Sequence, residues 1–249
     1  MLRPELLDAI ARDGSAFANA CALTDLDRRV LACPDWSVGD LLWHLTQAHS
    51  FWTQVVVQRS TTDRPSHVLA RPADGALLDL YRAGLSNLLG ALGDADDDAK
   101  VWTFTDDHSV AFVIRRVAHE TAIHSWDACQ AAQIDRVTDP QLCSDGIDEF
   151  LTHFIGRPDA DAQAVGGSVH IHCADVAGEW TLFPTATDAG FQLERAHIKG
   201  DCALRGTAAD LLAALWRRTP SSDAELIGGI SIVGDLHVAE RFLAYASLR

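Results

Sequence analysis

The sequence contains no run of about 18 uncharged apolar residues, so it predicts no transmembrane helix. Its first stretch, MLRPELLDAIARDG, reaches acidic residues almost at once and has no apolar signal-peptide segment, and we therefore expect a cytoplasmic protein. Positive charge is also scarce: Lys100 and Lys199 are the only lysines, and the formal net charge is -15. Because nucleic acids and anionic membranes attract clustered Lys and Arg, the sequence argues against both kinds of partner.

Several cysteine and cofactor motifs are missing as well. The six cysteines include no C-x-x-C pair, and they are Cys21, Cys33, Cys129, Cys143, Cys173 and Cys202. In a chain without a secretion signal we expect them to be reduced and partly buried. The sequence has no G-x-G-x-x-G, no Walker loop and no G-x-S-x-G elbow. Nucleotide-cofactor and serine-hydrolase chemistry therefore have no sequence support.

The first part of the chain predicts helices separated by short breaks. Apolar residues recur at helical spacing over 4–23 and 76–92, and a long helix is expected at 110–133. Ser37 followed three residues later by Asp40 predicts a capping box, which opens a helix that runs to about residue 57. A further helix in SDGIDEFLTHFIG is expected to cross the end of this bundle.

The composition changes after GRPDADAQAVGG. Four segments then alternate apolar and polar residues, as half-buried strands do: SVHIHCAD, EWTLFPT, GFQLERA and HIKGDCALRG. Two predicted helices follow, TAADLLAALWRR and LHVAERFLAYASL. Helices followed by strands indicate separate layers or domains. We therefore predict an α + (α+β) protein, with a helical bundle at 1–158 and a smaller α+β domain with a mostly antiparallel sheet at 159–249.

The stretch RRVAHETAIHSWDA places a glutamate between two histidines on the helix expected at 110–133. At about 100° per residue, Glu120 and His124 project within about 40° of each other, whereas His119 and His124 lie about 140° apart. His119 and His124 cannot bind one ion from a regular helix. Glu120 and His124 also lie on the apolar stripe of this helix, where an unpaired carboxylate is costly and needs a cationic neighbour.

A third ligand is available on the helix that follows Ser37. His44 lies at the edge of its apolar face, and His49, on the other flank, is a weaker candidate. Two histidines and one carboxylate, with a fourth position open, are typical of catalytic Zn²⁺ sites and of non-haem Fe(II) sites. A network of ordinary core hydrogen bonds is the competing interpretation.

Other charged clusters give weaker signals. His170 and His172 alternate on one predicted strand and face the same side, but the sequence suggests no third ligand beside them. Arg115 and Arg116 favour a solvated helix face over an anion-binding site.

Together, CPDWSVGDLLWHLTQAHSFW and RRVAHETAIHSWDA resemble the metal-binding domain of the mycothiol-dependent maleylpyruvate isomerase family, a branch of the DinB-like four-helix bundles. The family's W-S-V-x-D-L-x-x-H-L segment supplies one histidine, and its H-E-x-x-x-H segment supplies a glutamate and a second histidine. These ligands correspond to His44, Glu120 and His124. His119 matches the preceding histidine, which is not a ligand in the family.

The resemblance extends into the second half of the chain. LRGTAADLLAALWRR is similar to the family's C-terminal domain, which resembles sterol carrier protein folds. The family pattern D-L-L-x-x-L-x-G-R ends in an arginine implicated in catalysis, and this arginine corresponds to Arg218. Arg217 stands here in place of the preceding glycine.

The resemblance implies a thiol-dependent isomerase or S-transferase that uses a divalent metal, Zn²⁺ in the first instance, and mycothiol as cosubstrate. A thiol bound to the ion loses its proton more easily, and the thiolate can add to a small electrophile of the maleylpyruvate type. Arg218 would then screen a substrate carboxylate or a developing enolate. The alternatives are a metallohydrolase and a non-catalytic metal-containing protein that binds an apolar ligand. The oligomeric state stays open.

Overall fold

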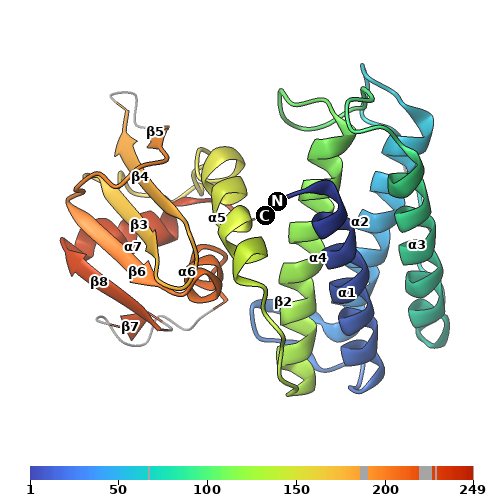
Figure 1. The fold of residues 1–249 in the computed structure, drawn as a ribbon. Helices are drawn as coiled ribbons and strands as arrows, with labels where there is room; N and C mark the ends of the chain where they lie inside the picture. The colour runs from blue at the N-terminus through green and yellow to red at the C-terminus, as the bar shows by residue number, and fades with distance from the viewer. Residues whose placement is uncertain (67, 186–189, 219–225, 228, 249) are drawn as a thin grey trace. The chain divides into compact units, whose positions relative to one another are not determined.

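The computed structural model describes residues 1–66, 68–185, 190–218, 226–227 and 229–248. The chain divides into two compact units, Met1–Val137 and Thr138–Arg249. Figure 1 shows that the first unit is built mainly of helices and the second of a sheet with helices. None of the described helices combines the length and the apolar character that crossing a bilayer requires.

The first unit is a bundle of four long helices with a small hairpin. Its elements are α1 (Arg3–Ala22), β1 (Arg29–Val30), β2 (Cys33–Ser37), α2 (Val38–Gln58), α3 (Asp74–Asp94) and α4 (Val110–Ala132). Helix α1 packs against α4 and α3, and α2 packs against α3 and α4. The apolar stripes expected from the sequence meet in one core, which includes Phe17, Leu41, Leu45, Val55, Leu88, Val113 and Val117. The predicted bundle is confirmed, whereas the hairpin was not expected.

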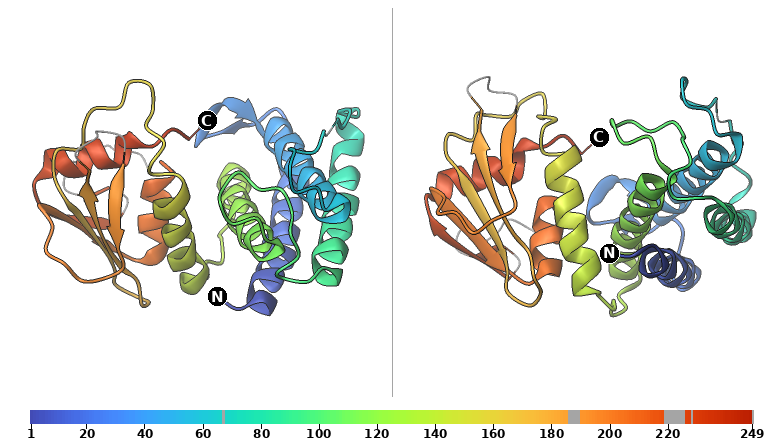
Figure 2. Two further views of the ribbon diagram at one scale, coloured as in Figure 1. Left: turned by 90° about the horizontal axis from the view of Figure 1, so that it is seen from above. Right: turned by 45° about the horizontal axis from the view of Figure 1, so that its top comes forward.

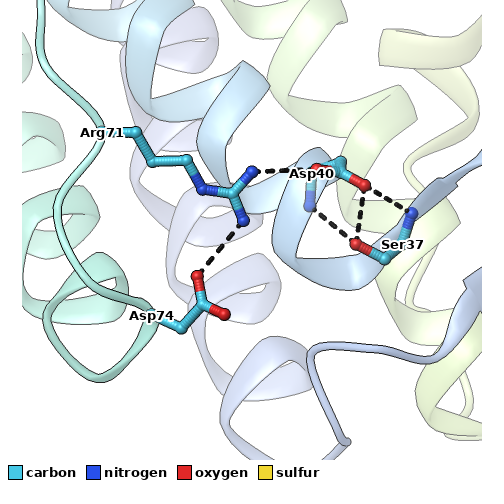
Figure 3. Close-up of polar contacts among 4 residues, drawn as sticks. All are labelled: Ser37, Asp40, Arg71 and Asp74. Atoms are coloured by element: carbon cyan, nitrogen blue, oxygen red, sulfur yellow. Dashed lines mark hydrogen bonds and ion pairs between the residues drawn. The ribbon is translucent and has the colours of Figure 1, made fainter.

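The start of α2 is held by the predicted capping box (Figure 3). The backbone N–H of Asp40 donates to Ser37 Oγ at 3.1 Å, and the backbone N–H of Ser37 donates to Asp40 Oδ2 at 3.0 Å. Arg71 donates to Asp40 at 2.9 Å and to Asp74, the first residue of α3, at 3.2 Å. Hydrogen bonds from Ser37 and Arg71 lower the pKa of Asp40 to about 2. This network ties the beginnings of α2 and α3 together.

The second unit contains a six-stranded sheet in the order β5-β4-β3-β6-β8-β7. Strands β3 and β6 are parallel, and every other neighbouring pair is antiparallel, as the prediction of a mostly antiparallel sheet requires. The helices of the unit lie on one face of the sheet (Figure 2). The elements are α5 (Pro140–His153), β3 (Val169–Cys173), β4 (Glu179–Pro184), β5 (Phe191–Glu194), β6 (Cys202–Gly206), α6 (Ala208–Leu215), β7 (Leu226–Ile227), β8 (Ile230–Gly234) and α7 (Leu236–Tyr245).

Helix α5 differs from the expectation. The sequence placed it at the end of the bundle, with the domain boundary near residue 158, whereas the chain divides after Val137. The physical reason is its apolar face, since Ile147 and Phe150 are buried in one core with Leu211 of α6 and Phe242 of α7. Helix α5 therefore belongs to the second unit.

The cysteines follow the expectation. No disulfide joins any of the six, all of which lie in the described part of the chain, and only Cys33 is partly exposed. Burial raises the pKa of Cys21, Cys173 and Cys202 to about 12. These thiols therefore stay protonated at neutral pH and contribute to the two cores.

Candidate metal centre

Helices α2 and α4 bring His44, Glu120 and His124 together inside the first unit. His44 Nε2 lies 3.5 Å from Glu120 Oε1. The imidazole rings of His44 and His124 have centroids 4.9 Å apart and are nearly perpendicular, at 77°. One nitrogen or oxygen atom from each of the three residues lies within 4.8 Å of the others. The helical-phase argument thus selected three side chains that converge.

The indole of Trp36, on the strand that leads into α2, forms one wall of this group. Its ring centroid lies 4.8 Å from that of His44 and 6.4 Å from that of His124. The side chain of His44 is still 37% exposed. The three polar side chains therefore have an aromatic neighbour and an approach from solvent.

The ring of His124 is oriented by a buried carboxylate. Its Nδ1 lies 3.0 Å from Asp127 Oδ2, and Asp127 is fully buried. Burial lowers the pKa of His124, although the hydrogen bond and charge of Asp127 oppose that effect. With a proton on Nδ1 shared with Asp127, the lone pair of Nε2 is available to a ligand, an arrangement typical of metal-binding histidines.

Glu120 is anionic at neutral pH despite its surroundings. Burial by itself would raise its pKa, but the hydrogen bond with His44 and the charge of Arg116 lower it to about 2. A half-buried carboxylate that keeps its negative charge suits a cation better than a neutral core.

The two neighbouring histidines do not join the group. His49 is buried and its Nε2 lies 2.9 Å from Thr121 Oγ1, so that it bridges α2 and α4. Burial lowers the pKa of His49 to about 4, and the ring is neutral at pH 7. His119 is also buried, but it is not among the side chains that converge with Glu120. Both placements agree with the helical-phase argument.

The donor set fits a tetrahedral divalent ion. Bonds of about 2.0–2.1 Å at tetrahedral angles place ligand atoms roughly 3.4 Å apart. The 3.5 Å between His44 and Glu120 is already close to that separation, and the widest separation in the group is within 4.8 Å. Two imidazoles and one carboxylate leave a fourth position for water or a substrate. The assignment of the three residues as ligands remains a prediction.

Two contributors were missed from the sequence. Asp127 follows His124 by three residues on the same helix, so the spacing H-x-x-D could have revealed it. Trp36 precedes the capping serine, and nothing in its own spacing pointed to His44. Its position depends on β2, which the sequence did not predict.

Arg218, the predicted catalytic residue, follows α6 in the second unit. Its guanidinium donates to the backbone oxygen of Trp216 at 2.7 Å and lies 5.9 Å from the Trp216 ring centroid. Arg217 has a φ of 54°, in the left-handed region that favours glycine. Its side chain donates to the carbonyl oxygens of Ala244 and Ala246 at 2.7 and 2.6 Å, near the end of α7. Arg217 thus adopts a left-handed backbone conformation at the position where the family pattern has a glycine, the residue that adopts it at least cost.

The fold and the site define a protein with a four-helix bundle that carries a candidate His–Glu–His centre, followed by an α+β unit. Residues 7–129 match the family model described as the mycothiol maleylpyruvate isomerase N-terminal domain, and residues 141–241 match the MDMPI C-terminal domain. Together the two models cover most of the chain. The chain belongs to the mycothiol maleylpyruvate isomerase family, an enzyme family, as the sequence motifs predicted.

Solved structures agree with this assignment. The crystal structure of the mycothiol-dependent maleylpyruvate isomerase is similar with a TM-score of 0.60 and 12% identity, over 93% of each chain. A mutant of the mycothiol-dependent maleylpyruvate isomerase is similar with a TM-score of 0.58 and 11% identity, over 86% of this chain and 88% of the other. The TM-scores show a common fold, and at identities this low they show the fold alone. None of the curated proteins matches the chain in sequence.

Proposed function

We propose that this protein is a metal-dependent enzyme that uses a low-molecular-weight thiol, mycothiol in the first instance, on a small electrophile of the maleylpyruvate type. The reaction is either an isomerisation or a transfer of the thiol sulfur to the substrate. The observation that carries the proposal is the convergence of His44, Glu120 and His124 within 4.8 Å. Family membership supports mycothiol as the thiol.

The three residues would hold a divalent ion, most simply Zn²⁺. When bound, such an ion supplies an open coordination position that lowers the pKa of a thiol and favours the thiolate at neutral pH. Glu120 contributes the negative charge that offsets part of the ion's charge, and its low pKa keeps that charge in place. Asp127 holds the ring of His124 so that Nε2 faces the ligand position.

The remaining features concern access and substrate charge. The partly exposed His44 leaves a route from solvent for a thiol and a small substrate, and the indole of Trp36 lies against its ring. Glu120 acts as a ligand and is not available as a general base. We assign Arg218, by its correspondence to the family's arginine, the role of binding a substrate carboxylate or a developing enolate.

The test is turnover of a maleylpyruvate-type substrate with and without mycothiol, in the wild type and in His44→Ala. We expect turnover to require the thiol. We expect the His44→Ala variant to lose both turnover and one Zn²⁺ per chain. His237→Ala is the matched control, because His237 is exposed and pairs with Glu240 on the surface of α7. Turnover that needs no thiol would favour a metallohydrolase, and full metal content in His44→Ala would overturn the ligand assignment.

A further inference from the structure

A second cluster of potential metal ligands lies in the C-terminal unit, on the sheet. It consists of His170 and His172 on β3, Glu179 on β4, and His197 in the segment between β5 and β6. One ligand atom from each of the four residues lies within 4.8 Å of all the others. The sequence suggested only the two histidines of β3, because the other two members depend on strand pairing and on the return of the chain.

The alternation of β3 and β4 places three of these side chains on one face of the sheet. Val169 and Ile171 are buried in the core beneath the helices, so His170 and His172 project from the opposite face. Glu179 lies directly across from His172 in the antiparallel β3–β4 pair. Side chains at such paired positions have Cβ atoms about 4.5–5.5 Å apart, within reach of a shared ion.

The fourth member is held over this face by a buried threonine of β4. Thr181 Oγ1 lies 3.1 Å from the carbonyl oxygens of both Ala196 and Ile198, and it accepts the backbone N–H of Ile198 at 3.3 Å. Thr181 itself pairs with His170 in the sheet and is fully buried. The residues on both sides of His197 are thus fixed beside the strand histidines, which preorganises the cluster.

Polar contacts among the described residues leave one buried nitrogen of the cluster without a partner. Glu179 Oε1 contacts the Nδ1 atoms of both His172 and His197, the latter at 3.2 Å. His170 is only 6% exposed, and its Nε2 is buried with no hydrogen-bond partner among the described residues. Its ring centroid lies 4.6 Å from that of His197. Buried polar atoms are normally satisfied, and an ion in the cluster would provide the missing interaction.

We propose that His170, His172, Glu179 and His197 form a second metal site, which binds Zn²⁺ or a similar divalent transition ion independently of the bundle. Three imidazoles and one carboxylate match this class of ion, whereas Ca²⁺ and Mg²⁺ prefer oxygen ligands. Tetrahedral coordination needs ligand atoms roughly 3.4 Å apart, so small rotations of the side chains would close the cluster around an ion.

Four protein ligands fill a tetrahedral shell, which is the pattern of a structural zinc site. An ion at this position would join β3, β4 and the segment that carries His197. It would have no open position for a substrate, unlike the proposed site in the bundle. The alternative is a group of hydrogen-bonded histidines around Glu179 that binds no ion, and metal analysis distinguishes the two.

The test measures Zn²⁺ per chain in the full-length protein without a histidine tag, after removal of metal by a chelator and equilibrium dialysis against Zn²⁺. We expect two ions in the wild type, one in His197→Gln, one in His44→Ala and none in the double variant. The side chain of His197 is 71% exposed, so its substitution leaves the core intact, and circular dichroism checks this. His237→Gln, an exposed histidine elsewhere in the same unit, is expected to retain two ions.

Affinity gives a second readout. In the His44→Ala background, His172→Gln and His197→Gln are each expected to weaken Co²⁺ or Zn²⁺ binding at least about tenfold, since even loss of an outer-shell partner costs 10–100-fold. A wild type with one ion that disappears in His44→Ala and persists in His197→Gln would overturn the second site and leave the proposed function standing. A single ion that persists in His44→Ala and disappears in His197→Gln would support the second site and argue against a metal ion in the bundle.

Discussion

At the scale of single residues, the bundle centre contains one buried and one half-buried carboxylate, Asp127 and Glu120. Asp127 is fully buried against the ring of His124, and Glu120 has a pKa of about 2. Their negative charges stand close to two imidazoles, of which His124 titrates below its ordinary range. This combination is the electrostatic reason for the proposal that the centre holds a cation.

We therefore expect Asp127→Asn to weaken Zn²⁺ binding at the bundle centre by about 10–100-fold, because the anionic partner that orients His124 is lost. The measurement is a Zn²⁺ titration of the variant and the wild type, followed by turnover at saturating metal. Binding at the sheet cluster in the same variant is the internal control and should not change. An unchanged affinity at the bundle centre would contradict the role assigned to Asp127.

From the lowered pKa of His49 we expect the stability of the metal-free protein to depend on pH. Its pKa is lowered by burial from 6.5 to about 4, so the unfolded chain takes up a proton that the folded chain does not. The free energy of unfolding should therefore fall as the pH drops from about 6.5 towards 4, by on the order of 3 kcal/mol. Denaturant unfolding at pH 7 and pH 4.5 measures it. His49→Gln should show a smaller drop than the wild type, and an equal drop would assign the effect to other groups.

At the scale of elements, interactions of its first turn fix where helix α2 begins. The capping box of Ser37 and Asp40 satisfies backbone N–H groups at the helix start, and Arg71 connects this turn to α3. The same helix carries His44, so the geometry of the candidate centre depends on where α2 begins. Arg71 and its carboxylate partners are exposed, and we expect the ion pairs themselves to contribute little.

Ser37→Ala is expected to lower the free energy of unfolding by about 1 kcal/mol, because the cap to the N–H of Asp40 is lost. Thermal or denaturant unfolding measures the change. Ser15→Ala is the matched control, since Ser15 is an exposed serine within α1 whose hydroxyl bonds only to the carbonyl oxygen of Ala11 one turn earlier. Equal effects of the two substitutions would argue that the cap does not stabilise α2.

At the scale of the whole molecule, chemistry-bearing residues are divided between two units. The bundle carries the candidate centre, and Arg218 belongs to the α+β unit together with the second histidine cluster. Both family models match the chain, one in each unit. If the family's arginine role applies, activity requires both units even though the metal ligands of the bundle lie in one.

Arg218→Ala is therefore expected to reduce kcat by about 10²–10³-fold, as loss of a charge that stabilises a developing anion does. The metal content should remain at the wild-type value, because no proposed ligand is changed. Arg82→Ala serves as the control, since Arg82 lies on the surface of α3 and pairs only weakly with Asp79 at 3.8 Å. Full activity in Arg218→Ala would rule out the catalytic role.

Local patterns accounted for most of the elements and for the helix faces that carry His44, Glu120 and His124. The 3.6-residue period separated His119 from Glu120 and His124, and it placed His44 at the edge of a buried face. The capping box appeared from two residues three positions apart, and β3, β4, β5 and β6 followed from alternation. Each of these patterns spans only neighbouring residues of one element, so the sequence alone determines it.

Tertiary structure decided the features that join distant segments. The apolar face of α5 fits either a bundle or a sheet, and its packing with α6 and α7 placed it in the second unit. Trp36 contacts His44 from strand β2, which belongs to a hairpin whose sequence shows no clear alternation of apolar and polar residues. Glu179 lies beside the two histidines of β3 because of the register between β3 and β4. His197 lies there because Thr181 hydrogen-bonds to the residues on either side of it. Periodicity sets which way a side chain points, but only long-range packing determines what it meets.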